Sequence, residues 1–193
     1  VTDSMAIDLG TASTIIAVKG RGVVLDEPSL VAINEISEEI VAFGQEAGDM
    51  AGREGRDVVV RAPLIGGVVG DFERTKKMLA HFVKKARTGG SNLSLQAVMS
   101  MVSDVTQVEQ RALLNAAEES HIGKVFMMEE ALAAAFGAGV LPTDKRASAI
   151  IDIGAATTNI AVVAKGNVIT STSERYGSSA INEVLATHLR RHR

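Results

Sequence analysis

The fold of this chain is decided by a stretch that occurs twice, as IDLGTAST at residues 7–14 and as IDIGAATTN at residues 151–159. In both copies an aspartate lies at the end of an apolar strand, and small residues follow it. Small residues let a backbone turn approach a polyphosphate closely and point N–H groups at its oxygens. The repetition therefore predicts a duplicated domain with one phosphate-binding loop in each copy.

Asp8 and Asp152 are the charged residues of the two loops. A carboxylate in this place suits holding a metal-bound water or orienting an attacking water, because Mg²⁺ prefers oxygen ligands and keeps several waters. One copy alone is equally well explained as a hairpin that turns at glycine. The second copy, 144 positions later and again followed by a strand-like run, favours the phosphate-binding interpretation.

Composition narrows the class of protein. The chain has 193 residues, of which 46% are apolar, so it is long enough to bury one sizeable core. A net charge of −3 without a long basic run argues against nucleic-acid binding. There is no cysteine, which removes disulfides and thiolate metal sites and fits a reducing cytoplasm. The longest nearly apolar stretch, residues 131–142, is too short to cross a bilayer, so we expect a cytoplasmic protein.

Hydrophobic periodicity predicts the elements between the two copies. Short strands are expected at 5–10, 13–18 and 23–25, in antiparallel order, followed by a small insertion with strands at 29–33, 40–43 and 57–61 and a helix at 45–55. A helix capped by Asp71 and ending near 88–90 comes next. Strands at 95–102 and 124–128 then alternate with helices at 111–120 and 129–137, and Thr106 with Glu109 forms a capping box. Such alternation predicts a parallel component in the sheet.

The second copy is predicted to restart the pattern with strands at 149–153, 158–164 and 168–172. A last helix places apolar residues at 181, 184, 185 and 189 on one face. The strand–helix pairs that would correspond to residues 95–139 do not follow. We therefore expect the second domain to be incomplete.

Six blocks in order carry a resemblance to a known family: IDLGTA at 7–12, DEPSLVAI at 26–33, GVVGDF at 67–72, TQVEQRA at 106–112, VFMMEE at 125–130 and DIG at 152–154. The chain resembles the actin-like ATPases and, within them, the MreB family of bacterial cell-shape filament proteins. The resemblance implies an α/β, actin-like (ribonuclease H-like) domain with a mixed sheet flanked by helices, plus the first part of a second, duplicated domain. It divides the chain into domain IA (1–33 and 64–145), an inserted subdomain IB (34–63) and the start of domain IIA (146–193).

The resemblance also implies ATP and Mg²⁺ as cofactors, bound in a cleft between two domains. Filaments formed by self-association or by co-assembly with a full-length MreB-type protein are implied, at the inner membrane face and with cell-shape membrane proteins as partners. Asp8 corresponds to the residue that holds Mg²⁺ through water, and Glu130 with Asp152 to the residues that polarise the attacking water. The implied nucleotide-binding residues are Gly10, Thr11, Ala12 and Ser13 in the first loop and Gly154, Ala155, Ala156, Thr157 and Thr158 in the second.

Several positions depart from the family pattern. Ala155 and Ala156 replace two glycines, Ala131 replaces a proline, and the segment 177–179 reads GSS where GGD is usual. If the alanines occupy left-handed positions, each costs about 1 kcal/mol. We therefore expect weak or impaired hydrolysis. For membrane insertion the sequence offers only Leu93 and Leu95 as an exposed apolar pair.

Three alternatives stay open. Glu130 opens a helix, where the dipole stabilises a carboxylate without any catalytic role. The chain as a whole fits a non-catalytic actin-like module that co-assembles with or regulates a full-length filament protein. Sugar kinases share the Asp-x-Gly-Thr hairpin, but no sugar-binding constellation is visible.

Overall fold

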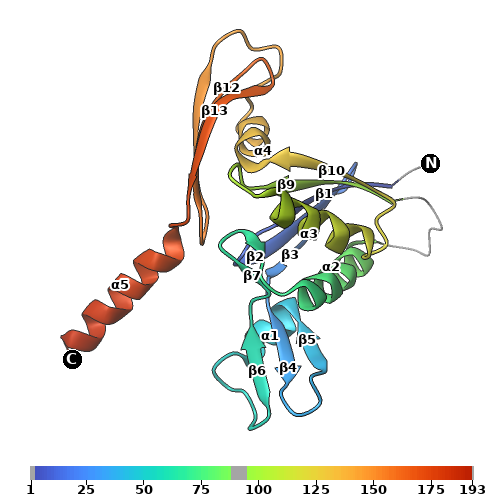
Figure 1. Ribbon diagram of the computed structural model, residues 1–193, viewed down its shortest axis with the longest axis vertical. Coiled ribbons are helices and arrows are strands. Elements are labelled where there is room, and N and C mark those ends of the chain that lie inside the picture. The colour runs from blue at the N-terminus through green and yellow to red at the C-terminus, as the bar shows by residue number, and fades with distance from the viewer. Residues whose placement is uncertain (1–2, 88–94, 193) are drawn as a thin grey trace. The chain divides into compact units, whose positions relative to one another are not determined.

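The computed structural model describes residues 3–87 and 95–192 and divides into two compact units (Figure 1). The first comprises residues 1–99 and 106–127, and the second residues 100–105 and 128–193. The largest sheet of the first unit contains the first repeated stretch, and the sheet of the second unit contains the second.

A five-stranded mixed sheet forms the centre of the first unit, in the order β10-β9-β1-β2-β3. Strand β1 (Asp3–Leu9) pairs antiparallel with β2 (Ser13–Val18), which pairs antiparallel with β3 (Gly22–Pro28). On its other side β1 pairs parallel with β9 (Leu95–Met101), and β10 (Lys124–Glu129) lies at the edge. The predicted antiparallel start and the parallel component are both confirmed.

Two helices complete the first unit, α2 (Phe72–Ala86) and α3 (Gln107–Glu118). The side chain of Asp71 accepts a hydrogen bond from the Arg74 amide, and Thr106 with Glu109 forms a capping box, as predicted. Helix α2 buries Met78, Leu79 and Phe82 completely, in a core that includes Ile7 and Ile16 of the sheet. The predicted end of this helix at 88–90 lies outside the described residues.

A small insertion follows β3. Its antiparallel sheet has the order β5-β4-β6, from β4 (Val31–Asn34), β5 (Ile40–Phe43) and β6 (Val58–Arg61), and α1 (Gly44–Met50) packs on it. Ala32, Ala42 and Ala47 form its buried centre. Helix α1 is shorter than predicted, because the chain turns at Gly52 with a φ of 76°. A short hairpin was not predicted. It consists of two strands of two residues each, β7 (Leu64–Ile65) and β8 (Val68–Val69).

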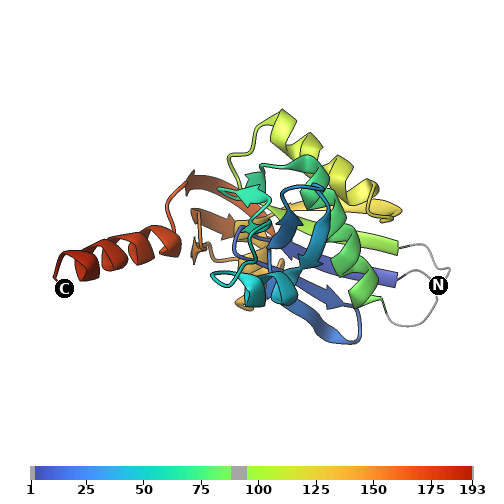
Figure 2. The same ribbon diagram turned by 90° about the horizontal axis from the view of Figure 1, so that it is seen from below.

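The second unit contains α4 (Glu130–Gly137), the strands β11 (Ser148–Ile153), β12 (Thr158–Ala164) and β13 (Asn167–Glu174), and α5 (Ser178–Arg191) (Figure 2). The three strands form an antiparallel sheet in chain order. One face of the sheet packs on α4 through a core cluster of Ala131, Ala135, Ala161 and Val163. Ala131, which stands where the family pattern has proline, is thus a fully buried packing residue.

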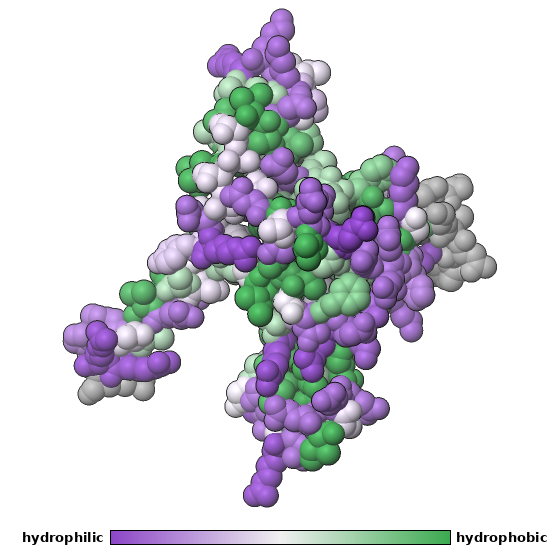
Figure 3. All heavy atoms as spheres, viewed as in Figure 1, coloured by the Kyte–Doolittle hydropathy of each residue, from purple (hydrophilic) through white to green (hydrophobic). Residues whose placement is uncertain are grey.

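The two sheets repeat each other in register. Ile7 pairs with Ile16 as Ile151 pairs with Ile160, and Leu9 pairs with Thr14 as Ile153 pairs with Thr158. Their burial differs, however. Ile7 is 2% exposed, whereas the equivalent Ile151 is 65% exposed, and α5 buries no residue. Figure 3 shows apolar side chains at the visible surface over both β11–β13 and α5. The duplicated face is covered in the first unit and open in the second.

Candidate functional site

The first repeated loop is a tight turn at the end of β1. Asp8 lies near the end of that strand and is exposed. The amide of Gly10 donates to the carbonyl oxygen of Ser13 at 3.0 Å, which closes the turn. A Cβ at Gly10 would stand 2.9 Å from the same oxygen, so the turn requires glycine. The predicted residues Gly10 to Ser13 therefore form one compact loop.

Buried hydroxyl groups hold this loop in place. Ser29 Oγ donates to the carbonyl oxygen of Gly10 at 2.6 Å and lies 2.8 Å from Thr14 Oγ1, and both side chains belong to fully buried residues. The Ser29 amide donates to the carbonyl oxygen of Ala12, and the Gly67 amide donates to Thr11 Oγ1 at 2.8 Å. Within residues 3–87 and 95–192, the amides of Thr11 and Ala12 donate to no backbone carbonyl oxygen. Two backbone donors are thus fixed and available to an anion.

The second loop has the same closing bond. The Gly154 amide donates to the carbonyl oxygen of Thr157 at 2.8 Å. Neither Ala155 nor Ala156 has a positive φ, so the strain expected for alanine in a left-handed position does not arise. In this turn the replacement of glycine carries no conformational cost.

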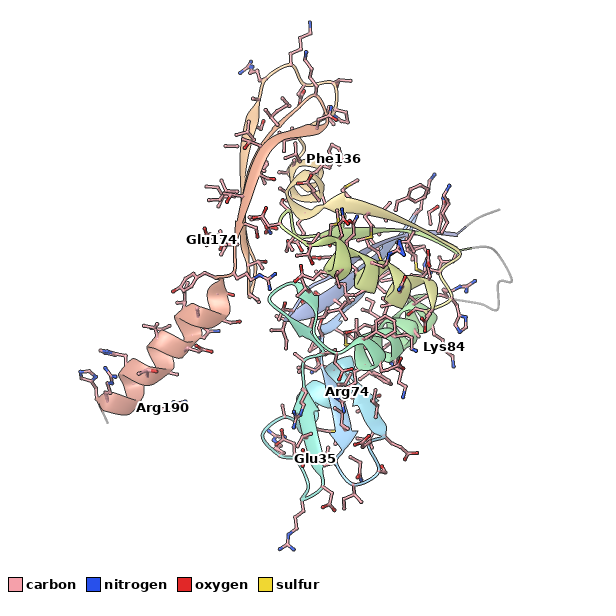
Figure 4. The ribbon with its side chains drawn as sticks, viewed as in Figure 1. Glu35, Arg74, Lys84, Phe136, Glu174 and Arg190 are labelled. Atoms are coloured by element: carbon pink, nitrogen blue, oxygen red, sulfur yellow. The ribbon has the colours of Figure 1, made fainter. Side chains whose placement is uncertain are left out.

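The start of α5 braces the second loop. The amides of Ser178 and Ser179 donate to the carbonyl oxygens of Gly154 at 3.0 Å and Ala155 at 2.9 Å. Thr158 Oγ1 donates to the carbonyl oxygen of Tyr176 at 2.7 Å. Figure 4 labels Glu174 at the end of β13, where the chain turns toward this contact. The GSS segment therefore serves as the support of the loop.

Glu130 is the first residue of α4, and its side chain is held by Asn159, a residue outside the predicted site. Asn159 Nδ2 donates to Glu130 Oε2 at 2.6 Å, and Asn159 is only 1% exposed. In the sheet Asn159 lies directly opposite Asp152. The structure thus brings Asp152, Asn159 and Glu130 together in the second unit. Asn159 ends the repeated stretch, and its contrast with Ile15 in the first copy was a usable signal.

Other polar side chains of the second unit fix the edge of its sheet. Asp104 Oδ2 accepts a hydrogen bond from the Ser173 amide at 3.0 Å, and Glu129 Oε2 lies 3.5 Å from Ser171 Oγ. Both contacts hold β13. Asp104 therefore has a structural role.

The described residues fit a lightly coordinated Mg²⁺ rather than a metal cage. They contain no group of three acidic, histidine or cysteine side chains able to hold a metal. Mg²⁺ in nucleotide sites is usually held by one or two carboxylates and by phosphate oxygens, with water completing its shell. The single exposed carboxylate of Asp8 beside a loop with available amides agrees with that kind of binding.

Neither a membrane-spanning helix nor the predicted exposed apolar pair is found among the described residues. Among the residues that the structure describes, no helix has the length and apolarity needed to span a bilayer. Leu95 is 2% exposed within the core and is not available for insertion, while Leu93 lies outside the described residues.

Comparison with known proteins gives a consistent result. The family model described as MreB/Mbl protein matches residues 2–193. The chain is 38% identical over 187 residues to the cell shape-determining protein Mbl of Bacillus subtilis and 37% identical over 195 residues to the cell shape-determining protein MreB of Escherichia coli. These alignments cover 97% and 98% of this chain but 56% of each relative. The chain therefore spans about half the length of the curated relatives it matches.

A solved structure, that of MreB 5 of Spiroplasma citri bound to AMPPNP, superimposes with a TM-score of 0.86 at 32% identity. The match covers 98% of this chain and 57% of that one. The expected actin-like fold is confirmed by this similarity.

Proposed function

The chain belongs to the MreB/Mbl family, and from this premise we propose that it binds ATP with Mg²⁺ and acts as a cytoskeletal filament subunit in rod cell-shape determination. The observation that carries the proposal is the pair of loops with one closing geometry, Gly10 to Ser13 and Gly154 to Thr157. The AMPPNP-bound state of the Spiroplasma relative and the cell-shape role in the names of the curated relatives support it.

Each proposed residue has a defined task. The fixed amides of Thr11 and Ala12 donate to phosphate oxygens, and Asp8 is the residue that would hold Mg²⁺ through water. A metal held there would supply charge neutralisation on the phosphates. Asp152 and Glu130 orient the attacking water. This is the role that phosphoryl transfer requires of a protein carboxylate, because the rest of the catalysis is positioning and charge stabilisation. We propose that Ser13, Thr157 and Thr158 line the same phosphate-binding loops.

Hydrolysis is proposed to be slow. The support is the altered second loop, in which Ala155 and Ala156 place methyl groups where relatives of this family have glycine. The alanines are compatible with the backbone of the turn, so the effect is expected from crowding at the phosphate and not from a distorted loop.

Three measurements on the 193-residue chain test this function. Binding of a fluorescent ATP analogue with and without Mg²⁺ reports the nucleotide site. Sedimentation with MgATP reports self-association, and phosphate release reports turnover. Asp8→Asn is expected to weaken the Mg²⁺-dependent part of binding. A chain that neither binds nucleotide nor sediments would contradict the proposal.

A second candidate is a non-catalytic module that co-assembles with a full-length MreB-type protein. The open apolar face at Ile151 and Ile160 and the unburied helix α5 favour it, because such surfaces are typical of interaction sites. Co-sedimentation with Escherichia coli MreB in ATP and in ADP tests it. If the chain stays in the supernatant in both ATP and ADP, co-assembly is contradicted. Flotation with anionic vesicles in the same experiment tests association with the inner membrane face.

A further inference from the structure

The two copies of the repeat differ in their second strand, where a buried asparagine of the second copy takes the place of a half-buried isoleucine of the first. Asp8 lies opposite Ile15 in the first sheet, and Asp152 lies opposite Asn159 in the second. The two pairs have the same register, so Ile15 and Asn159 are structural equivalents. An apolar side chain is therefore compatible with this position of the sheet.

A buried asparagine at that position is unfavourable for the stability of the fold. It is depleted in strands, and burial of an amide is unfavourable unless its polar atoms are paired. Asn159 is 1% exposed and shares its face of β12 with the core residues Ala161 and Val163. Its Oδ1 atom is buried and has no hydrogen-bond partner among the described residues. Stability alone would favour the isoleucine of the first copy.

Among the described residues, the side chain of Asn159 hydrogen-bonds to Glu130. Nδ2 donates to Oε2 over 2.6 Å, which is short for a bond from an amide nitrogen. An ionised carboxylate only accepts hydrogen bonds, so the amide nitrogen must face Glu130 and Oδ1 must point away from that contact. The bond fixes the rotamer of Glu130 and leaves a buried acceptor beside it.

We infer that Asn159 is the positioning residue for Glu130 and that its unpaired Oδ1 accepts a hydrogen bond from the water that Glu130 orients. This inference rests on the proposed ATP hydrolysis. In that step the water oxygen forms a bond to the terminal phosphorus, and the bond from this phosphorus to the bridging oxygen breaks. The electron pair leaves with ADP, and the proton of the water passes to Glu130 and then to solvent.

The test replaces Asn159 by its structural equivalent from the first copy. Asn159→Ile should lower phosphate release on the order of 10²-fold, the usual contribution of a positioned general base. Nucleotide affinity should change less than twofold, because neither loop is altered. The urea midpoint should stay equal or rise. Ile169→Thr, at a 64% exposed position of β13, is the control and should leave all three quantities unchanged.

A double-mutant cycle separates positioning from a structural role. Once Glu130→Gln has removed the group that Asn159 positions, adding Asn159→Ile should change the rate less than twofold. In ¹⁵N spectra of the nucleotide-free chain, the side-chain amide of Asn159 should shift in Glu130→Gln and not in Ile169→Thr.

The outcomes that overturn the inference differ from those that overturn the function. Equal turnover in Asn159→Ile and wild type, additive losses in the double mutant, or an Asn159 amide insensitive to Glu130→Gln would each overturn the positioning role. Nucleotide binding without measurable turnover in the wild type would overturn it too, while leaving the binding function intact. Loss of nucleotide binding by the wild type contradicts the proposed function itself.

Discussion

Gly177 lies so close to Ala155 that a Cβ at position 177 would stand 2.5 Å from the Ala155 carbonyl oxygen and 2.6 Å from its carbonyl carbon. Both of these atoms belong to the backbone, so neither can move aside as a flexible side chain would. The contact explains why the first turn of α5 can donate its amides to the carbonyl oxygens of Gly154 and Ala155.

Gly177→Ala is therefore expected to push α5 away from the second loop. Overpacking against backbone typically costs about 1–3 kcal/mol of stability, and we expect weaker nucleotide binding as well. Gly137→Ala is the matched control, because a Cβ there meets nothing within 4 Å. The control should leave stability unchanged or slightly raised. Urea unfolding of both variants checks the prediction, and equal midpoints would contradict it.

The repeat offers a matched pair for burial. Ile7→Ala removes a side chain that is 2% exposed and should cost about 2–4 kcal/mol through lost burial and a cavity. Ile151→Ala removes its equivalent, which is 65% exposed, and should change stability by about 0.5 kcal/mol at most. Measuring the free energy of unfolding of both variants checks this prediction. Comparable losses would show that the second face is covered in solution.

Restoring the family glycines should not strengthen the second loop. Ala155 and Ala156 have negative φ, so Ala155→Gly and Ala156→Gly relieve no backbone strain. Each should lower stability by about 0.4–1 kcal/mol by adding freedom to the unfolded chain. Calorimetry gives the stability, and titration with nucleotide in parallel reveals whether the methyl groups crowd the phosphate. A gain in stability from either glycine would refute this account of the turn.

The ion pair of Lys85 with Glu27 should stabilise the fold up to alkaline pH and lose its effect above it. The hydrogen bond from Lys85 to the carboxylate of Glu27 raises the pKa of Lys85 above its ordinary value. A raised lysine pKa adds stability that is complete below the unfolded-state pKa, about 10.4, and is lost as pH rises through the folded-state pKa. The Lys85 side chain is 55% exposed, so the pair is worth about 1 kcal/mol at most.

The measurement is the difference in unfolding free energy between wild type and Lys85→Met from pH 8 to pH 11.5. The difference should be constant up to about pH 10 and shrink above it. Lys84→Met is the neighbouring control, and Figure 4 shows Lys84 on the outer side of α2. A Lys85 difference that grows with pH would contradict the assigned sign.

Local patterns in the sequence were enough for most elements. The strands of both repeats, the cap at Asp71 and the capping box at Thr106 depend on neighbours within a few residues, and the structure confirms them. The β7–β8 hairpin was missed because two-residue strands carry no periodicity. The length of α1 was overestimated because its end is set by a turn at Gly52.

By itself the sequence determined that this chain contains a duplicated strand–loop–strand unit with an aspartate before each turn, because that information is written in adjacent residues. Only the tertiary structure decided which polar groups meet. The bond between Asn159 and Glu130 joins residues 29 positions apart, and the brace of Gly177 on Ala155 depends on the path of β12 and β13. Identical periodicity also gave one buried and one open sheet face, because burial depends on what packs there and not on the strand that presents it.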